Sequence, residues 1–194
     1  MKKVISILLL VLLQINVVFA QNWDIDLLRN INNNRNQHFD PFFKVISDNT
    51  AAIAYGVPAS FLVVSFIKKD SLMKQKALVQ CGSLLSSAVF STVLKYTINR
   101  ERPFVTYPFI QKIGEGGSPS FPSGHTTCSF AMATSLSLTY PKWYVIAPSF
   151  VWASSVAYSR MHLGVHYPSD VLVGAILGSG SAYLTYKVNK WLRK

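Results

Sequence analysis

Five apolar stretches separated by short polar blocks constrain the fold of this chain more than any other feature. Each approaches the roughly 20 residues that a helix needs to cross a bilayer, although several are short or contain polar residues. Only 14% of the 194 residues are charged, against about 25% in an average soluble domain. The sequence therefore predicts an all-α, polytopic membrane bundle with about five transmembrane helices, at residues 51–67, 77–94, 126–140, 143–158 and 171–186.

The residues before these spans divide into two parts. Residues 1–20 combine a charged start, an apolar run and a cleavage context that ends at Ala20, which together are typical of a secretory signal peptide. An uncleaved first membrane helix is the alternative. Residues 21–49 are polar, rich in Asn and partly amphipathic, so they are expected to form a short helix on the membrane surface. Residues 50–194 are the expected membrane-embedded domain.

The net charge of +11 is concentrated beside the apolar stretches, in a linker at 68–76 and in the tail at 187–194. Basic clusters in these places indicate the cytoplasmic side of a membrane protein. No recognised nucleic-acid-binding motif accompanies the charge, so no nucleic-acid partner is expected. With five alternating spans, all three polar blocks of the second half then face the opposite side, away from the cytoplasm.

The first polar block holds Lys95 and Arg102. Arg presents a planar fork to two oxygens of a phosphoryl group, and Lys adds a compact positive charge. Taken alone, the pair also fits residues that anchor a helix at the membrane interface. Arg100 is expected to be such an anchor, or a partner of Glu101.

The second polar block is Pro122-Ser123-Gly124-His125, which opens the third span. Ser123 is a favourable N-cap, and the free N–H groups and dipole of a helix N-terminus attract anions. Gly124 lets a phosphate approach the backbone closely. His125 is suited to give a proton to a leaving oxygen. An ordinary helix cap next to a chance histidine is the alternative for this block.

The third polar block contains Arg160, His166 and Asp170. An aspartate four residues from a histidine can accept its ring N–H and fix its tautomer, which suits a histidine that attacks phosphorus. Ser169 is expected to cap the fifth span. His162 extends the four-residue spacing and raises the possibility of a metal site, but Gly164 and Pro168 interrupt the helix that this spacing requires, and no HExxH is present. We therefore expect His162 to be a loop or packing residue.

Together the three blocks resemble the type 2 phosphatidic acid phosphatase family, which shares its active-site pattern with vanadium haloperoxidases and bacterial acid phosphatases. The family pattern is K-x6-R-P, then P-S-G-H, then S-R-x5-H-x3-D, and residues 95–170 match it without departure. The resemblance implies His166 as the nucleophile, Asp170 as its partner and His125 as the general acid, with no metal or other cofactor. It implies that the phosphate is bound by Lys95, Arg102, Ser123, Gly124 and Arg160.

The expected function is therefore hydrolysis of a lipid phosphate or pyrophosphate at the outer face of the bacterial cytoplasmic membrane, through a phosphohistidine. Undecaprenyl pyrophosphate, phosphatidylglycerophosphate, phosphatidic acid and lipid A are the candidate substrates. The alternatives are a vanadium-dependent peroxidase and a non-catalytic protein that binds phospholipid headgroups. The sequence gives no indication of the oligomeric state.

Overall fold

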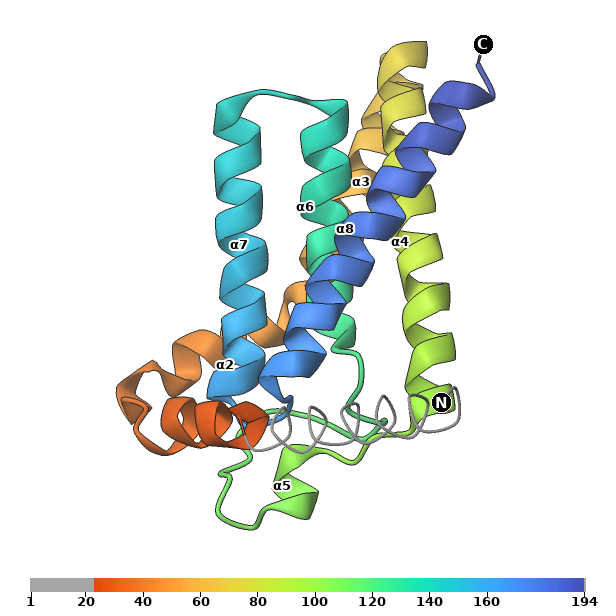
Figure 1. Ribbon diagram of the computed structural model, residues 1–194. Helices are drawn as coiled ribbons and strands as arrows, with labels where there is room; N and C mark the ends of the chain where they lie inside the picture. The colour runs from red at the N-terminus through yellow and green to blue at the C-terminus, as the bar shows by residue number, and fades with distance from the viewer. Residues whose placement is uncertain (1–22, 194) are drawn as a thin grey trace, which may run out of the picture.

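The computed structural model describes residues 23–193, and within that range the chain is helical with no strand. The expected signal peptide lies outside the described residues. Residues 23–33 form a helix that lies across one end of a bundle of longer helices (Figure 1). The elements that follow are η1 (Gln37–Phe39), α2 (Asp40–Asp48), α3 (Thr50–Ile67), α4 (Ser71–Ile98), α5 (Pro103–Thr106), α6 (Gly124–Thr139), α7 (Trp143–His162) and α8 (Pro168–Trp191).

Helix α6 is the centre of the bundle and contacts α3, α4, α7 and α8 (Figure 1). Its buried face consists mostly of small residues such as Ala131 and Ala133. Opposite them, a Cβ atom on Gly174 or Gly178 of α8 would collide with the α6 backbone. Small side chains on both surfaces let membrane helices approach closely, where van der Waals contact rather than water exclusion drives association.

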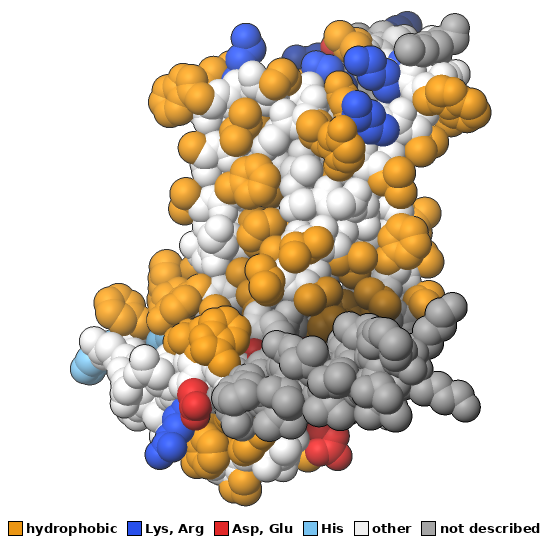
Figure 2. Space-filling model, viewed as in Figure 1, with side chains coloured by type: hydrophobic (Ala, Val, Ile, Leu, Met, Phe, Trp, Pro, Cys, Tyr) orange, Lys and Arg blue, Asp and Glu red, His pale blue; other side chains and the backbone are white. Residues whose placement is uncertain are grey.

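Large apolar side chains cover the outside of the bundle (Figure 2). Such a surface is costly in water but matches the hydrocarbon interior of a bilayer. Three segments are both long and apolar enough to cross a membrane: Gln37–Ile67, Ser71–Thr106 and Pro168–Trp191. The outward-facing residues include Leu85, Val89, Val151, Ile176 and Leu184.

All five expected helices are present as α3, α4, α6, α7 and α8, so the prediction of a helical membrane bundle is confirmed. The number of helices that cross the bilayer completely stays a prediction. Helix α6 has 16 residues, which gives it a length of about 24 Å. That length is less than the roughly 30 Å of a typical hydrocarbon core.

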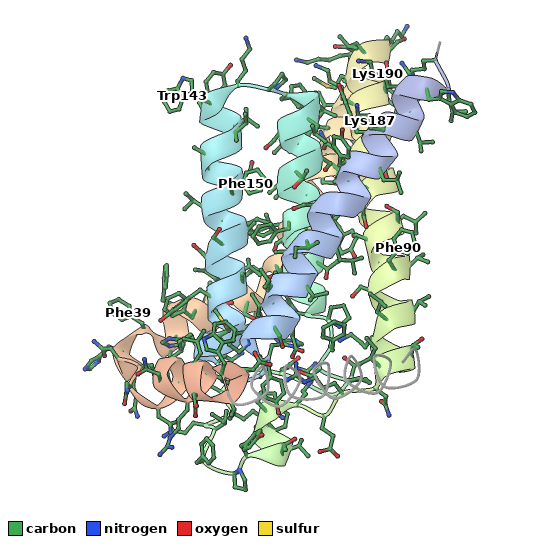
Figure 3. The ribbon with its side chains drawn as sticks, in the orientation of Figure 1. Phe39, Phe90, Trp143, Phe150, Lys187 and Lys190 are labelled. Carbon is green, nitrogen blue, oxygen red and sulfur yellow. The ribbon has the colours of Figure 1, made fainter. Side chains whose placement is uncertain are left out.

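The two ends of the bundle differ in chemistry. At one end the α6–α7 turn and the C-terminal part of α8 carry Trp143, Lys187 and Lys190 (Figure 3). Lysines are typical of the cytoplasmic boundary of a membrane protein, and aromatic residues such as Trp are typical of either boundary. At the other end lie α2, α5 and the N-termini of α6 and α8 (Figure 1). The three polar blocks of the sequence meet at this second end.

The helix at 23–33 packs into the protein at the second end. Leu28 is fully buried in an apolar cluster with Ile110 and Tyr167. The Asn32 side chain donates to the carbonyls of His162 (2.9 Å) and Gln111 (3.1 Å). A short helix in this segment was expected, and Leu28 packs it against loops of its own chain. Its position on the membrane surface stays a prediction.

Candidate active site

A cavity of about 230 Å³ at the polar end of the bundle brings together residues from all three polar blocks. The loop at 115–118 also borders it. Because the N-terminus of α6 opens into the cavity, unpaired backbone N–H groups of its first turn are available to an anion. The predicted residues that line the cavity are Lys95, Arg102, Gly124, His125, Arg160 and His166.

The two predicted arginines are buried and held by the backbone. The Nε of Arg102 donates to the Ser118 carbonyl (2.8 Å), and its Nη1 donates to the Val165 carbonyl (2.9 Å). Arg160 donates to the hydroxyl of Ser47 and to the Glu115 carbonyl (3.0 Å). Its buried Nε finds no acceptor in the described part of the chain. A buried cation with an unused donor is costly unless an anion completes its hydrogen bonds.

Lys95 reaches the same cavity from the last turns of α4. Its Nζ donates to the carbonyls of Pro119 (2.6 Å) and Pro122 (3.0 Å), which fixes the ammonium beside the start of α6. Gly124 leaves open space where a Cβ would lie, so a ligand can approach the backbone there.

Ser123 is at the predicted N-cap position of α6, but it does not play the role expected of it. Its side chain makes no capping bond, and its hydroxyl accepts from Thr126 Oγ1 (3.0 Å). The Ser123 N–H donates to the Asp170 carbonyl (3.0 Å). This N–H is therefore engaged by α8 in the structure, and the part of Ser123 in phosphate binding stays a prediction. Ser123 is fully buried behind Gly124 and outside the cavity lining.

His166 lies between α7 and α8, where the chain reverses direction. The reversal depends on Gly164, whose φ of +71° is in the left-handed region that favours glycine. The His166 Nδ1 is 3.4 Å from Asp170 Oδ2, and its Nε2 is 3.4 Å from Nη1 of Arg102. Because an ionised carboxylate only accepts, the proton belongs on Nδ1, and the Nε2 lone pair faces the cavity.

Burial lowers the pKa of His166 to about 3. The Asp170 carboxylate acts in the opposite direction, while the cations Arg160 and Arg102 add to the lowering. The imidazole is therefore neutral near pH 7, which is the form that can act as a nucleophile.

Asp170 is fully buried, and both of its carboxylate oxygens accept hydrogen bonds in addition to the contact with His166. Oδ1 accepts from Arg100 (2.8 Å), and Oδ2 accepts from Ser120 Oγ and from the Tyr167 N–H (3.0 Å). The last bond caps α8, whose N-cap is Tyr167 with Pro168 next. The expectation that Ser169 caps this helix is therefore wrong.

Arg100 is the largest correction to the sequence analysis. It was expected to anchor at the interface or to pair with Glu101, but it forms ion pairs with Asp170 and with Asp24 (2.7 Å). The one feature of the sequence that could have indicated a role for Arg100 near the site is its position two residues before Arg102. No local signal marks Asp24, because its partner Ser169 is 145 residues away in the chain.

His162 is a packing residue, one of the two roles expected for it. Its ring lies 4.4 Å from that of Phe43, centroid to centroid, and its Nε2 is 2.8 Å from Asp40 Oδ1. Within residues 23–193 no group of three His, Cys, Asp or Glu side chains is placed to hold a metal ion.

An apolar groove joins the cavity from the side. It has a volume of about 270 Å³, runs between α3, α4 and α6, and shares Lys95, Gly124 and His125 with the polar cavity. The rest of its lining is mainly small or apolar and comes from Ala51, Tyr55, Ser87, Ala88, Ser91, Thr92, Thr127 and Cys128.

A membrane-helix bundle with cations, a helix N-terminus and a His–Asp pair around one cavity defines a membrane-embedded site for a phosphate-sized anion. The family model of the PAP2 superfamily matches residues 76–194 of this chain. The chain belongs to this superfamily, which confirms the resemblance drawn from the three polar blocks.

Individual relatives agree with this membership. The chain is 35% identical over 88 residues to the lipid A 4'-phosphatase of Bacteroides thetaiotaomicron, covering 45% of this chain and 39% of that protein. It is 36% identical over 107 residues to the undecaprenyl-diphosphatase of Sulfolobus acidocaldarius, covering 55% and 52%. The chain thus spans about half the length of these relatives or less.

A solved structure shares the fold across almost the whole chain. The transmembrane PAP2-type phosphatidylglycerolphosphate phosphatase of Bacillus subtilis superimposes with a TM-score of 0.74 and 24% identity, covering 98% of this chain and 97% of that one.

Proposed function

We propose that this protein hydrolyses the phosphate ester or pyrophosphate of a membrane lipid through a phosphohistidine intermediate. One observation carries the proposal: His166 lines a cavity bordered by Lys95, Arg102 and Arg160, with its Nδ1 beside Asp170. Because Asp170 accepts the proton of Nδ1, Nε2 is the unprotonated ring nitrogen. The three cations neutralise the phosphoryl oxygens, while Asp170 holds the opposite ring nitrogen.

The chemistry takes two displacement steps. In the first, Nε2 of His166 attacks phosphorus and a P–N bond forms. The P–O bond to the lipid breaks as His125, which enters the step as an imidazolium stabilised by the negative charge of the bound phosphate, gives its proton to the leaving oxygen. In the second, water attacks the phosphohistidine and loses a proton to His125, the P–N bond breaks, and inorganic phosphate leaves. Atoms and charges balance without a cofactor.

The apolar groove supports a lipid as the substrate rather than a soluble ester. It meets the polar cavity at Lys95, Gly124 and His125, so one molecule can place its phosphate among the cations and its hydrocarbon between α3, α4 and α6. The names of the relatives give two candidate substrates, lipid A and undecaprenyl pyrophosphate. Phosphatidylglycerophosphate and phosphatidic acid remain further candidates.

The distribution of charge supports an orientation with the site on the outer, periplasmic face of the cytoplasmic membrane. The lysines at the end of the bundle away from the site satisfy the positive-inside rule when that end is cytoplasmic. The substrate phosphate then lies in the outer leaflet.

The direct test is phosphate release by the purified protein from a panel of prenyl, glycerolipid and lipid A phosphates in detergent micelles. We expect turnover of at least one lipid phosphate, and much slower turnover of a water-soluble phosphate monoester. If the protein releases phosphate from none of the lipids in the panel, the proposed function is refuted. A preference for the soluble ester would refute the assignment of a lipid substrate.

A further inference from the structure

We propose that Asp24 and Arg100 are positioning residues for the reaction, which orient Asp170 and, through it, His166. The inference rests on the proposed function, because it assigns these residues a part in the same site. Neither residue lines the phosphate cavity. Asp24 lies outside the three motifs that relate the chain to its family, and Arg100 occupies an unspecified position within the first.

Arg100 is held in one orientation by four contacts. Its Nη1 donates to Asp170 Oδ1 (2.8 Å) and to Ser169 Oγ (2.7 Å), and its Nη2 donates to Asp24 Oδ2 (2.7 Å). The guanidinium carbon lies 3.7 Å from the centre of the Tyr167 ring. A planar guanidinium with carboxylates on two of its nitrogens cannot be replaced by a lysine without loss of one contact.

Asp24 is buried, with a side chain only 4% exposed. Its Oδ1 accepts from the Ser169 N–H (2.8 Å), and its Oδ2 accepts from Ser169 Oγ (2.5 Å) as well as from Arg100. It therefore satisfies a free N–H in the first turn of α8, where a negative charge is also favoured by the helix dipole. Through it the helix at 23–33 fixes the start of the helix that carries Asp170.

These contacts connect Asp24 through Arg100 and Asp170 to His166, and the first three side chains alternate in charge. Because Arg100 occupies Oδ1 of Asp170, only Oδ2 is left to face Nδ1 of His166. The carboxylate is thus prevented from rotating away. Arg100 also weakens the negative field of Asp170 at the imidazole, and Asp24 partly offsets Arg100 in turn.

This series of contacts predicts the direction in which each substitution shifts the pKa of His166. Without the Arg100 cation, more of the Asp170 charge acts on His166, stabilises the imidazolium and raises the pKa of His166. Without the Asp24 charge, the cation is no longer offset, so the pKa of His166 falls. The other charged groups that act on the His166–Asp170 pair are Lys95, Arg102 and Arg160, and they stay unchanged in both variants. A merely structural role would not move the two variants in opposite directions.

The experiment compares Arg100→Gln and Asp24→Asn in the full-length protein. Asp26→Asn is the matched control, since Asp26 is exposed on the same helix. The probe is phosphatidic acid in detergent micelles, or another lipid phosphate if the wild type prefers it. We expect kcat to fall about tenfold in both variants with KM within about twofold, and no change in the control. NMR titration of isotope-labelled histidine is expected to show opposite shifts in the pKa of His166.

Shifts in the same direction, or none, in a folded variant would overturn the inference. Because the titration needs no turnover, it tests the inference even if the wild type releases no phosphate, an outcome that counts against the proposed function alone. If Asp24→Asn fails to fold, Arg100→Lys replaces it. This variant keeps the cation, so the pKa of His166 should stay closer to the wild-type value than in Arg100→Gln. Equal values for the two Arg100 variants would contradict the inference.

Discussion

His166 has almost no freedom to face any direction other than the cavity. Asp170 lies on one side of its ring, Arg102 on the other, and only 1% of its surface is exposed. Enzymes gain much of their rate from groups that are already oriented before the substrate binds. Single substitutions at His166 and Asp170 therefore test the proposed chemistry most directly.

Replacement of the proposed nucleophile should abolish turnover. We expect His166→Ala to lower kcat by at least about 10³-fold, because His166 is the cavity histidine whose ring is held by Asp170, and Asp170→Asn to lower it by a similar order. Phosphate release and acid-labile labelling by a radioactive substrate are the measurements. Unchanged helical circular dichroism serves as the folding control. Full activity in His166→Ala would refute the assignment.

The pH behaviour of His166 follows from its burial. The neutral imidazole is the reactive form, so a pKa lowered to about 3 keeps it reactive in mild acid, and it becomes protonated only as the pH falls through that value. We expect the NMR signal of His166, assigned by comparison with His166→Ala, to titrate well below the ordinary histidine value of about 6.5. A midpoint near 6.5 in the ligand-free protein would contradict this prediction.

The cavity-lining residues from the three polar blocks could be predicted from the sequence, because each lies in a short motif with fixed spacing, whereas the lining at 115–118 could not. The partners behind them could not. Arg100 and Glu101 are neighbours in the chain, and their pairing was the simplest expectation, yet Asp170 and Asp24 are the partners in space. The role of Ser120, which donates to Asp170, also depends on a contact between distant parts of the chain.

At the scale of elements, the close approach of α6 and α8 positions the site. Gly174 and Gly178 face the α6 backbone near Ser123 and Thr127, where any Cβ would collide. The bond from the Ser123 N–H to the Asp170 carbonyl joins the starts of the same two helices. Displacement of one helix therefore changes the distance between the phosphate-binding turn and the His–Asp pair.

The glycines of α8 allow a matched test of this packing. We expect Gly178→Ala to destabilise the protein by about 1–3 kcal/mol, because its methyl group overlaps the backbone of Thr127 and Ala131. Gly180→Ala is the control, since nothing lies within 4 Å of its Cβ position. Thermal unfolding in detergent should show a lower Tm for the first variant only. Equal Tm values would mean that α6 and α8 can separate at little cost.

The existence of the helices was predictable from apolar runs, but their ends were not. The predicted fifth span at 171–186 lies within α8, which begins at Pro168 because Asp170 accepts the Tyr167 N–H and caps the helix. Ser169 looked like the better cap by residue type, but its N–H and hydroxyl both bond to Asp24. A partner from a distant segment overrode the local preference.

The whole molecule has a basic end and a reactive end, with an apolar surface between them (Figure 2). A charge that crosses a bilayer during insertion is costly, and this asymmetry is the basis of the proposed orientation. The basic clusters on which this orientation rests, at 68–76 and 187–194, are visible in the sequence, and the orientation itself stays a prediction. The position of residues 23–33 over the reactive end was less predictable, because it depends on contacts of Asp24 and Asn32 with distant parts of the chain.

Orientation can be tested by cysteine labelling in a variant that lacks Cys81 and Cys128. A cysteine at the exposed position of Glu101 should react with a membrane-impermeant maleimide in intact spheroplasts. A cysteine at Lys142, at the opposite end, should react only after the membrane is permeabilised. The reverse pattern would place the reactive end in the cytoplasm and contradict the proposed outer-leaflet substrate.

The bond between the Ser123 N–H and the Asp170 carbonyl has a consequence for protein engineering. This backbone hydrogen bond links the start of α6, which carries the anion-binding turn, to the start of α8, which carries Asp170. The two helix starts are therefore expected to work only as a matched pair. Grafting a different substrate preference onto this scaffold should therefore succeed through the groove and the loop at 115–118. Chimaeras that exchange α6 or α8 alone should disrupt this hydrogen bond, whereas exchange of both helices together should preserve it.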